Sequence, residues 1–315
     1  MNRASIFLLL CLFPYMGMAQ EYQTITFGGQ AIRVEIIEVE GKKIPVGDMG
    51  AVGNRIFEKE KETIVDHAKV ECIYSYSIYD PEVDKHRNDL YYMLLSGNNY
   101  SWYRRYHNYQ IDSLLSHRDM SKVTNKYYEA VFRYFGEGDM GDPEENLKNQ
   151  KTGEIETYDF FAGSSYVCTE PRIDFGWTLS DDTLTICGHS CHKATCSFRG
   201  RDWIAWYADD IMLSDGPWKF GGLPGLILKI QDSKQEHVFV ASVLRNGRPE
   251  STIVKKERAY AFGAKREWML KAKRNAKENP AAALKAAGMI PKNLDGTDVE
   301  FPRKRLYVFN PIEKE

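Results

Sequence analysis

The sequence has little net charge and little cysteine, and beyond its N-terminus it has no long hydrophobic run. Its 315 residues include 42 Lys and Arg against 44 Asp and Glu, a formal charge of −2. A chain so close to neutral is not expected to bind nucleic acid, which requires a basic surface. No later segment is apolar enough to span a membrane, since a spanning helix needs about 20 apolar residues. The composition, 43% hydrophobic and 27% charged, is that of an ordinary globular protein.

The N-terminus has the pattern of a secretory signal peptide. Arg3 supplies a positive charge, an apolar run from Ile6 to Met18 follows, and Gly17 and Ala19 are the small residues of a cleavage site. We therefore expect residues 1–19 to be removed during export.

Export would leave one domain, residues 20–315, in the periplasm, associated with the outer membrane or secreted. Two alternatives use the same N-terminal segment. It could remain as a membrane anchor, for which the apolar run is short, or Cys11 could carry a lipid, although the preceding Leu10 is large for that role. Removal of the signal leaves five cysteines, an odd number, so at least one thiol is not paired within the chain.

Alternating apolar and polar residues predict a fold rich in strands. Two strands are expected within Tyr22–Glu40, one at Val70–Tyr79, and a hairpin from Leu90–Leu95 and Tyr100–Tyr106. Consecutive antiparallel strands are expected from Glu154 to Glu257.

Three segments have a sequence pattern typical of helices. We expect helices from Ser121 to Phe135, from Tyr260 to Lys277 and from Ala281 to Ala287, and an acidic loop at Gly136–Asn149. The fold class predicted is α+β: a curved, mainly antiparallel sheet or half-open barrel, with helices packed on one side and a C-terminal helical segment. The excess of Lys and Arg in Lys255–Lys277 fits either a solvated helix face or a docking surface for an anionic partner or lipid headgroups.

The segment Trp218–Ile230, WKFGGLPGLILKI, is rich in glycine and precedes an aliphatic run. It lacks the Lys-Ser/Thr ending of a phosphate-binding loop, and no helix follows. We interpret it as a structural turn. Gly222 permits close packing, Pro224 takes the second position of a type II turn, and Gly225 takes the third with a positive φ.

The segment Cys187–Cys196, CGHSCHKATC, holds three thiols and two imidazoles within ten residues. These groups suit Cu(I) or Zn(II), so Cys191, Cys196, His189 and His192 are candidate metal ligands. The spacing is not that of a standard zinc knuckle, because there is no Cys-x2-Cys pair.

A structural disulfide competes with the metal site for the same thiols. A three-residue loop at residues 188–190 would bring Cys187 opposite Cys191, within disulfide reach. Cys196 could instead pair with Cys168 or Cys191. A nucleophilic Cys191 beside a histidine is a further alternative, although no orienting third group is visible.

The run Tyr100–Tyr109, YSWYRRYHNY, combines aromatic and basic residues. Such a run is typical of protein interfaces and carbohydrate-stacking surfaces. A strand with one buried aromatic face and an exposed basic edge explains it equally well.

The segment GPWKFGGLPGLILKI, Gly216–Ile230, resembles the signature of the GLPGLI family, exported proteins of Bacteroidetes. The resemblance extends to Phe198–Arg201 and Ala205–Tyr207, to Gly188 and Cys191–Cys196, and to Asn310–Glu313 near the end of the chain. It implies export and a β-rich domain, and it implies no established reaction.

These observations favour an exported cell-envelope protein of non-catalytic binding or scaffold type, without a cofactor. The expected partner is an envelope protein or an apolar ligand. The alternative is a periplasmic copper- or zinc-handling protein that uses the Cys187–Cys196 segment, and a hydrolase is the last alternative.

Overall fold

The computed structural model describes most of the chain in two compact units. The residues described are 22–27, 30–47, 61–81, 83–119, 122–124, 126–127, 130–131, 144–161, 164–258, 261–279, 282 and 310–314. The first unit comprises residues 1–60 and 107–140, and the second comprises 61–106 and 141–315.

The first unit contains a three-stranded antiparallel sheet. Its strands are β1 (Tyr22–Phe27), β2 (Gln30–Val39) and β3 (Lys42–Gly47), in the order β1-β2-β3. Helix α1 (Tyr106–Leu115) begins at the boundary of the unit and buries Ile111 and Leu115. These two side chains share a core with apolar residues of β2 and β3, so the helix and the sheet stabilise one another.

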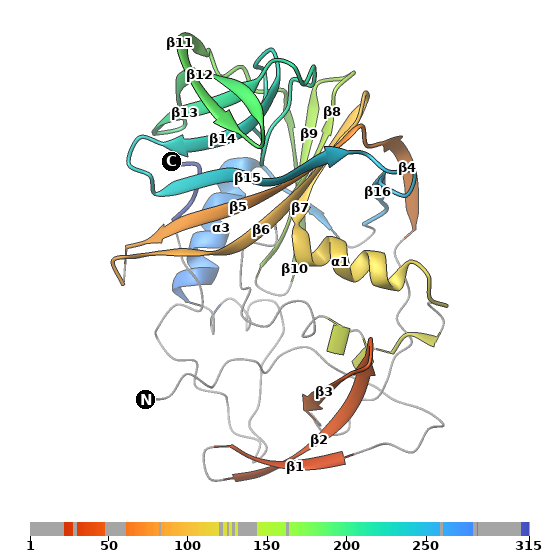
Figure 1. Cartoon of the computed structure of the whole chain (residues 1–315). Helices are drawn as coiled ribbons and strands as arrows, with labels where there is room; N and C mark the ends of the chain where they lie inside the picture. Colours follow the sequence, from red (N-terminus) through yellow and green to blue (C-terminus); the bar gives the residue numbers. More distant parts are fainter. Residues whose placement is uncertain are drawn as a thin grey trace. The chain divides into compact units, whose positions relative to one another are not determined.

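The second unit is built on a sheet of twelve strands (Figure 1). The order across this sheet is β11-β12-β13-β14-β15-β5-β6-β7-β8-β9-β10-β17. The strands are β5 (Val70–Asp80), β6 (Lys85–Ser96), β7 (Tyr100–Arg105), β8 (Glu145–Asn149), β9 (Glu154–Phe161), β10 (Ser164–Pro171), β11 (Thr178–Ile186), β12 (His189–Phe198), β13 (Arg201–Ala208), β14 (Leu226–Asp232), β15 (His237–Asn246) and β17 (Phe262–Gly263). A separate pair joins β4 (Glu62–His67) to β16 (Thr252–Lys256).

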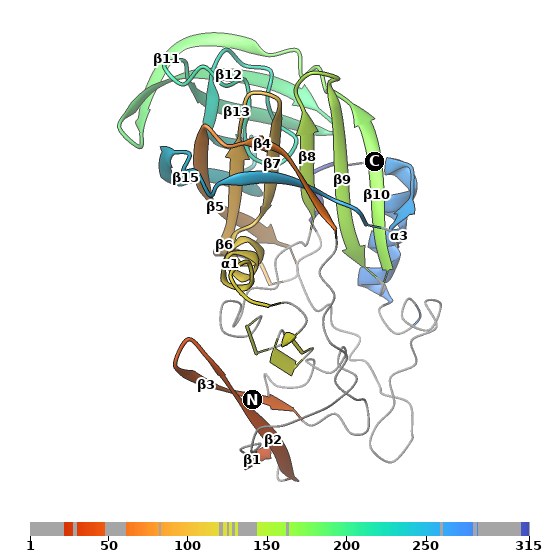
Figure 2. The ribbon, with the colours of Figure 1, turned by 90° about the vertical axis from the view of Figure 1, so that its right-hand side faces the viewer.

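The large sheet is open and almost entirely antiparallel. Among the described strands, only the short pairing of β10 with β17 is parallel. The order of strands has two ends, β11 and β17, so the sheet is not a closed barrel. Helix α3 (Arg266–Glu278) lies beside β10 (Figure 2), and no helix among the described residues is long and apolar enough to cross a membrane.

The strands predicted from alternation are confirmed, including both strands within Tyr22–Glu40 and the series after Glu154. The prediction was wrong at the end of the aromatic run, where Tyr106 begins helix α1 instead of ending a strand. The expected basic edge of this run is also wrong, since Arg104 and Arg105 are both buried in β7. Trp102 lies under the Arg104 guanidinium, 4.3 Å from its ring centre, so the aromatic and the cation are buried together.

The predicted acidic loop is wrong in its last part, because Glu145–Asn149 forms strand β8 between β7 and β9. The predicted helix from Tyr260 starts later, at Arg266, after the short strand β17. The predicted helices at Ser121–Phe135 and Ala281–Ala287 lie largely outside the described residues.

The turn before β14 differs from the predicted type II turn. Gly222 has a positive φ of 85°, whereas Gly225 does not have a positive φ. A Cβ at Gly225 would lie 2.1 Å from the backbone oxygen of Ala208. Gly225 is therefore required for the close approach of two backbone segments, and Gly222 supplies the left-handed conformation.

We expect Gly225→Ala to destabilise the protein by more than about 3 kcal/mol, since the added methyl group meets backbone atoms that have little freedom to move. The matched control is Gly263→Ala, where a Cβ meets nothing within 4 Å. Urea unfolding of both variants would measure the difference. Equal stability of the two variants would contradict the close approach.

Candidate functional site

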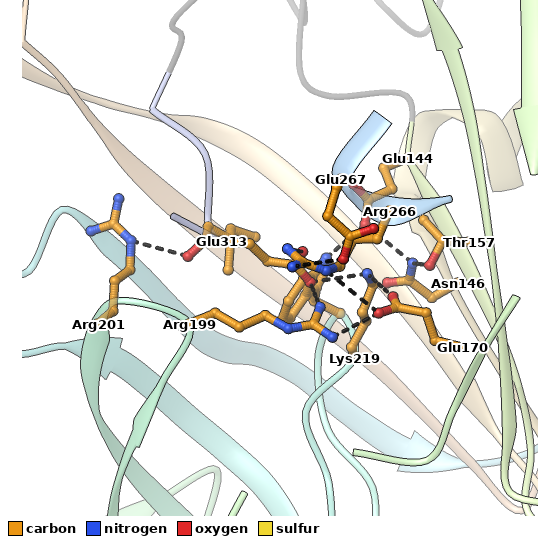
Figure 3. Close-up of polar contacts among 12 residues, drawn as sticks. Glu144, Asn146, Thr157, Glu170, Arg199, Arg201, Lys219, Arg266, Glu267 and Glu313 are labelled. Carbon is orange, nitrogen blue, oxygen red and sulfur yellow. Dashed lines mark hydrogen bonds and ion pairs between the residues drawn. The ribbon is translucent and has the colours of Figure 1, made fainter. Parts of the chain in front are cut away.

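Three segments that are far apart in the sequence meet at one buried group of charges (Figure 3). They are the turn between β12 and β13, the loop that precedes β14, and the C-terminal residues 310–314. We call this group the tail anchor, and its members are Glu170, Arg199, Arg201, Lys219, Asp232, Glu236, Arg266 and Glu313.

Arg201 uses every N–H of its guanidinium within the chain. Its side chain is only 1% exposed. The acceptors are the carboxylates of Asp232 (3.0 Å) and Glu236 (2.6 Å), Oδ1 of Asn310 (2.6 Å), and the carbonyls of Pro311 (2.9 Å) and Ile312 (3.1 Å). A guanidinium has five N–H donors, so this one is saturated. Two of its contacts are to strand β14 and the loop after it, and three are to the C-terminal segment.

Glu313 is held by three cations. Its carboxylate accepts hydrogen bonds from Arg199, from Lys219 Nζ at 3.0 Å and from Arg266 at 3.1 Å. Glu170 of β10 faces the same cations, at 2.6 Å from Arg199 and 2.7 Å from Lys219. The three cations therefore face two buried carboxylates, which fixes the tail against β10, α3 and the turn.

The charges of the tail anchor stabilise one another in their ionised forms. Burial alone would raise the pKa of Glu170, but the ion pairs with Lys219 and Arg199 outweigh it and hold that pKa below its usual value. Burial alone would lower the pKa of Lys219, but Glu313, Glu144 and Glu170 outweigh it and raise that pKa. Both groups stay charged near neutral pH.

His237 lies next to the tail anchor and is fully buried. Its Nδ1 is 2.7 Å from the hydroxyl of Tyr76, and its backbone N–H donates to Asp232 at 2.8 Å. Burial first, and then the nearby Arg201 cation, hold the pKa of His237 well below 6.5. The imidazole is therefore neutral in the folded protein near neutral pH.

A second buried charge group secures the start of the same loop. Lys148 of β8 donates to Asp215 (2.5 Å) and to the carbonyls of Gly216 (3.0 Å) and Phe220 (3.1 Å), while Ser96 donates to Asp215 at 2.7 Å. Burial lowers the pKa of Lys148, against the opposing effect of Asp215. This group joins two strands of the sheet, β6 and β8, to the loop before β14, so it positions the loop.

A small pocket opens between the two charge groups. It has a volume of about 20 Å³ and is lined by Lys148, Arg172, Asp215 and Lys219 together with apolar side chains. This is room for about one water molecule.

The predicted metal ligands all lie on strand β12. Residues two apart on a strand share a face, so His189 and Cys191 are on one face, while His192 and Cys196 are on the other. His189 contacts Asp210 (2.7 Å) and His192 contacts Asp209 (3.4 Å). Among the described residues, no three His, Cys, Asp or Glu side chains are grouped as a metal site. The structure does not bring the four ligands together, and metal binding stays a prediction.

All five cysteines of the described residues are free thiols. The expected three-residue loop is wrong: the hairpin turns on Cys187 and Gly188, and Leu184 pairs with Cys191. Cys187 donates to the carbonyl of Ala241 at 3.3 Å.

The remaining thiols are not poised to react. Cys168 and Cys196 belong to separate apolar clusters, one beside α3 and one in the main core. Burial raises the pKa of Cys191 to about 11 and that of Cys196 to about 12. Both thiols stay protonated near neutral pH, whereas nucleophiles and metal ligands are thiolates.

The tail anchor contains residues that no local pattern singled out. The resemblance covered Arg199, Arg201, Lys219 and Glu313, but it gave them no role. Their carboxylate partners, Glu170 among them, stand in unremarkable strand sequences. Only the preserved order of charged residues in the signature segments could have pointed to them.

The geometry defines a mainly β protein whose C-terminal segment is fastened to its sheet by buried ion pairs. A family model described as "Protein of unknown function (Porph_ging)" matches residues 199–229, from the turn before β13 into β14. No curated protein matches the chain.

Two solved structures of PNGF-II, in space groups P21 and C2, are similar to this chain at 13% and 14% identity, each with a TM-score of 0.44. Each match covers 66% of this chain and 33% of that chain. The chain thus spans about a third of the length of the solved chains it matches, and a likeness at this level does not bear on function.

We expect Arg201→Lys to destabilise the protein by about 3 kcal/mol or more, because an ammonium has three donors and cannot satisfy the five acceptors. The control is Lys61→Ala, which removes an exposed ion pair with Glu257 and should change little. Chemical unfolding measures both. A loss for Arg201→Lys no larger than for the control would contradict the anchoring role.

We expect stability to fall as the pH drops below about 6.5. The unfolded chain can protonate His237 at that pH, whereas the folded chain cannot, so protons favour unfolding by up to about 1.4 kcal/mol per pH unit. The measurement is urea unfolding between pH 7.5 and about pH 5, above the range in which carboxylates titrate.

In the variant His237→Asn this pH dependence should be reduced, even if overall stability is lower. The control His117→Gln alters an exposed histidine and should keep the wild-type slope. An unchanged slope in His237→Asn would show that other groups cause the effect.

Proposed function

We propose that this chain is an exported, non-catalytic scaffold of the cell envelope that binds a protein partner along the edge strand β11. Export is supported by the signal-peptide pattern of residues 1–19 and by the resemblance to the GLPGLI family, of which we propose it is a member. The observation that carries the binding role is the exposed edge of the twelve-stranded sheet.

Strand β11 has β12 as its one neighbour among the described strands. Of its nine residues only Ile186 is buried, and Leu179 and Leu184 are 57% and 39% exposed. A long strand with an open edge presents unpaired backbone groups to another extended chain. This is the geometry used when a peptide adds a strand to a sheet.

The half of β11 nearest the turn is the more suitable for pairing. Ile186 and His189 flank a two-residue turn, so they are bonded to each other, and Leu184 is the next residue bonded to β12. By alternation, Thr183 and Thr185 point their amide and carbonyl groups away from β12. These groups are available to a partner strand.

The other half of β11 carries negative charge. A bulge between Ser180 and Thr183 leaves Asp181 and Asp182 outside the ladder, and Asp182 contacts Lys193 at 2.6 Å. A bulge with charges limits unwanted pairing at an edge. We therefore propose an extended partner segment with an apolar residue beside Leu184 and a basic residue near Asp181.

The buried charges of the signature support a role in folding. Arg199, Arg201 and Lys219 are engaged by carboxylates and carbonyls of the same chain. Substrate would have to displace these contacts to reach them. The signature therefore serves the scaffold, and the exposed edge serves binding.

The test places a photo-reactive amino acid at Thr183 in the full-length chain, expressed in a host that exports it. We expect a cross-linked adduct of one defined mass, reduced about fivefold by Thr185→Pro, since the substitution removes one backbone hydrogen bond worth about 1 kcal/mol. Mass spectrometry identifies the adduct and shows whether the mature chain begins at Gln20.

The same photo-reactive residue at the exposed Lys234 is the control and should give no such adduct. The absence of an adduct at Thr183, or an adduct that Thr185→Pro leaves unchanged, would overturn the proposal. A native mass that includes one copper or zinc would instead favour the metal-handling alternative.

A further inference from the structure

Four aromatic rings form one cluster around Tyr166 at the β17 end of the large sheet. Phe161 is buried and stacks on Tyr166 of β10 at 4.4 Å between ring centres. Tyr166 in turn contacts Phe262 of β17 at 6.0 Å and Trp268 of α3 at 5.2 Å. Tyr166 thus contacts all three other rings, and the outer two, Phe262 and Trp268, reach the surface.

The two outer rings are unusually exposed for their size. Phe262 is 62% exposed and Trp268 is 49% exposed. They come from different elements, β17 and α3, and meet over one tyrosine. Exposed, adjacent aromatic rings of this kind mark a binding surface more often than chance exposure does.

Two lysines flank the exposed tryptophan on α3. Lys271 follows Trp268 by three residues, so it lies about one helical turn away on a neighbouring part of the same face, and Lys265 is the N-cap residue of α3, three residues before Trp268. Both are exposed, and neither side-chain ammonium has a hydrogen-bond or ion-pair partner among the described residues. The nearby Glu267 is neutralised in part by Arg266, at 3.3 Å. We call Phe262, Lys265, Trp268 and Lys271 the aromatic–lysine surface.

We propose that the aromatic–lysine surface docks the protein on an anionic lipid surface. Trp and Phe rings insert at the level of the headgroups, where one part of the environment is apolar and another is wet. Lysine ammonium groups beside them attract lipid phosphates. The positive charge of the lysines complements anionic headgroups and selects them over neutral lipid. This inference goes beyond the proposed function and uses no residue of β11.

The mature protein would be mixed with vesicles of phosphatidylcholine, with or without phosphatidylglycerol, and sedimented. We expect binding to the anionic vesicles, weakened by added salt. Lys265→Glu together with Lys271→Glu should weaken binding about tenfold or more. Phe262→Ser should weaken it several-fold, and adding Trp268→Ala to that variant should weaken it further.

Matched controls alter exposed residues elsewhere in the second unit. Lys151→Glu with Lys234→Glu reverses two exposed charges, and Met212→Ser removes a side chain that is 91% exposed. Both should bind as the wild type does. Thermal unfolding of each variant shows whether it is folded, and Phe262→Ser tests the surface without removing the Trp268 contact to Tyr166.

The proposal is overturned if the wild type does not sediment with anionic vesicles, or if the control variants lose as much binding as the surface variants. Equal binding to neutral vesicles, unchanged by the lysine reversals, would overturn the selection of anionic headgroups. If the surface instead binds a protein, the wild type will not sediment with pure lipid. Failure here leaves the cross-linking at β11 unaffected, so the two proposals are tested separately.

Discussion

The guanidinium of Arg201 is the contact on which the C-terminal end of the fold depends. It is the first residue after a two-residue turn in which Arg199 and Gly200 both have positive φ values, 44° and 76°. The tight turn aims Arg201 at Asp232 on one side and at the backbone of residues 311 and 312 on the other. One guanidinium thus connects the turn between β12 and β13, strand β14 and the C-terminal residues 310–312.

In some proteins buried ion pairs contribute more to conformational specificity than to stability. Removing charges from water costs several kcal/mol per ion, and the cost is recovered only when every donor and acceptor is matched. The tail anchor meets this condition at Arg201 and Glu313. A C-terminal segment without these charges, or in another register, would leave cations buried and unpaired. The network therefore favours one position of the C-terminal segment over other positions in which apolar contacts alone would hold it.

The sequence predicted the strands well, because alternation is a local property. It did so for Val70–Asp80 and for the hairpin that follows. In β5 buried and less buried positions alternate from Tyr74 to Tyr79, whereas residues 71–74 are buried without a break. Strand β8 was missed because ENLKN is polar, and its Lys148 is buried only through contacts with a loop 67 or more residues away. Helix α1 was missed because its first residues continue the aromatic pattern of β7.

The site was harder to predict than the fold for the same physical reason. Glu313 and Arg199 are 114 residues apart, and no local spacing relates them. Gly225 shows the same limit of local prediction. The Pro-Gly pair predicts a turn of standard type from adjacent residues. Gly225 is needed for another reason, because a Cβ placed there would lie 2.1 Å from the backbone oxygen of Ala208. The cysteines and histidines of β12 resemble a metal-binding motif because they are close in sequence. The strand places neighbouring residues on opposite faces, so it separates them.

The arrangement separates two physical roles within the second unit. Charges that are buried are matched within the chain, as in Lys219 with Glu170 and Glu313, and they hold the loop and the tail on the sheet. Exposed groups lie at the two ends of the strand order. At one end the backbone of β11 is open, and at the other the aromatic rings of the aromatic–lysine surface reach the solvent. A rigid sheet can keep such ends apart, so that binding at one end does not disturb the other.

Because the tail anchor fastens Glu313 to Arg266 at the start of α3, it also fixes the helix that presents Trp268. The buried network and the exposed surface are therefore linked through one helix. The buried charges position α3, and α3 presents the exposed Trp268.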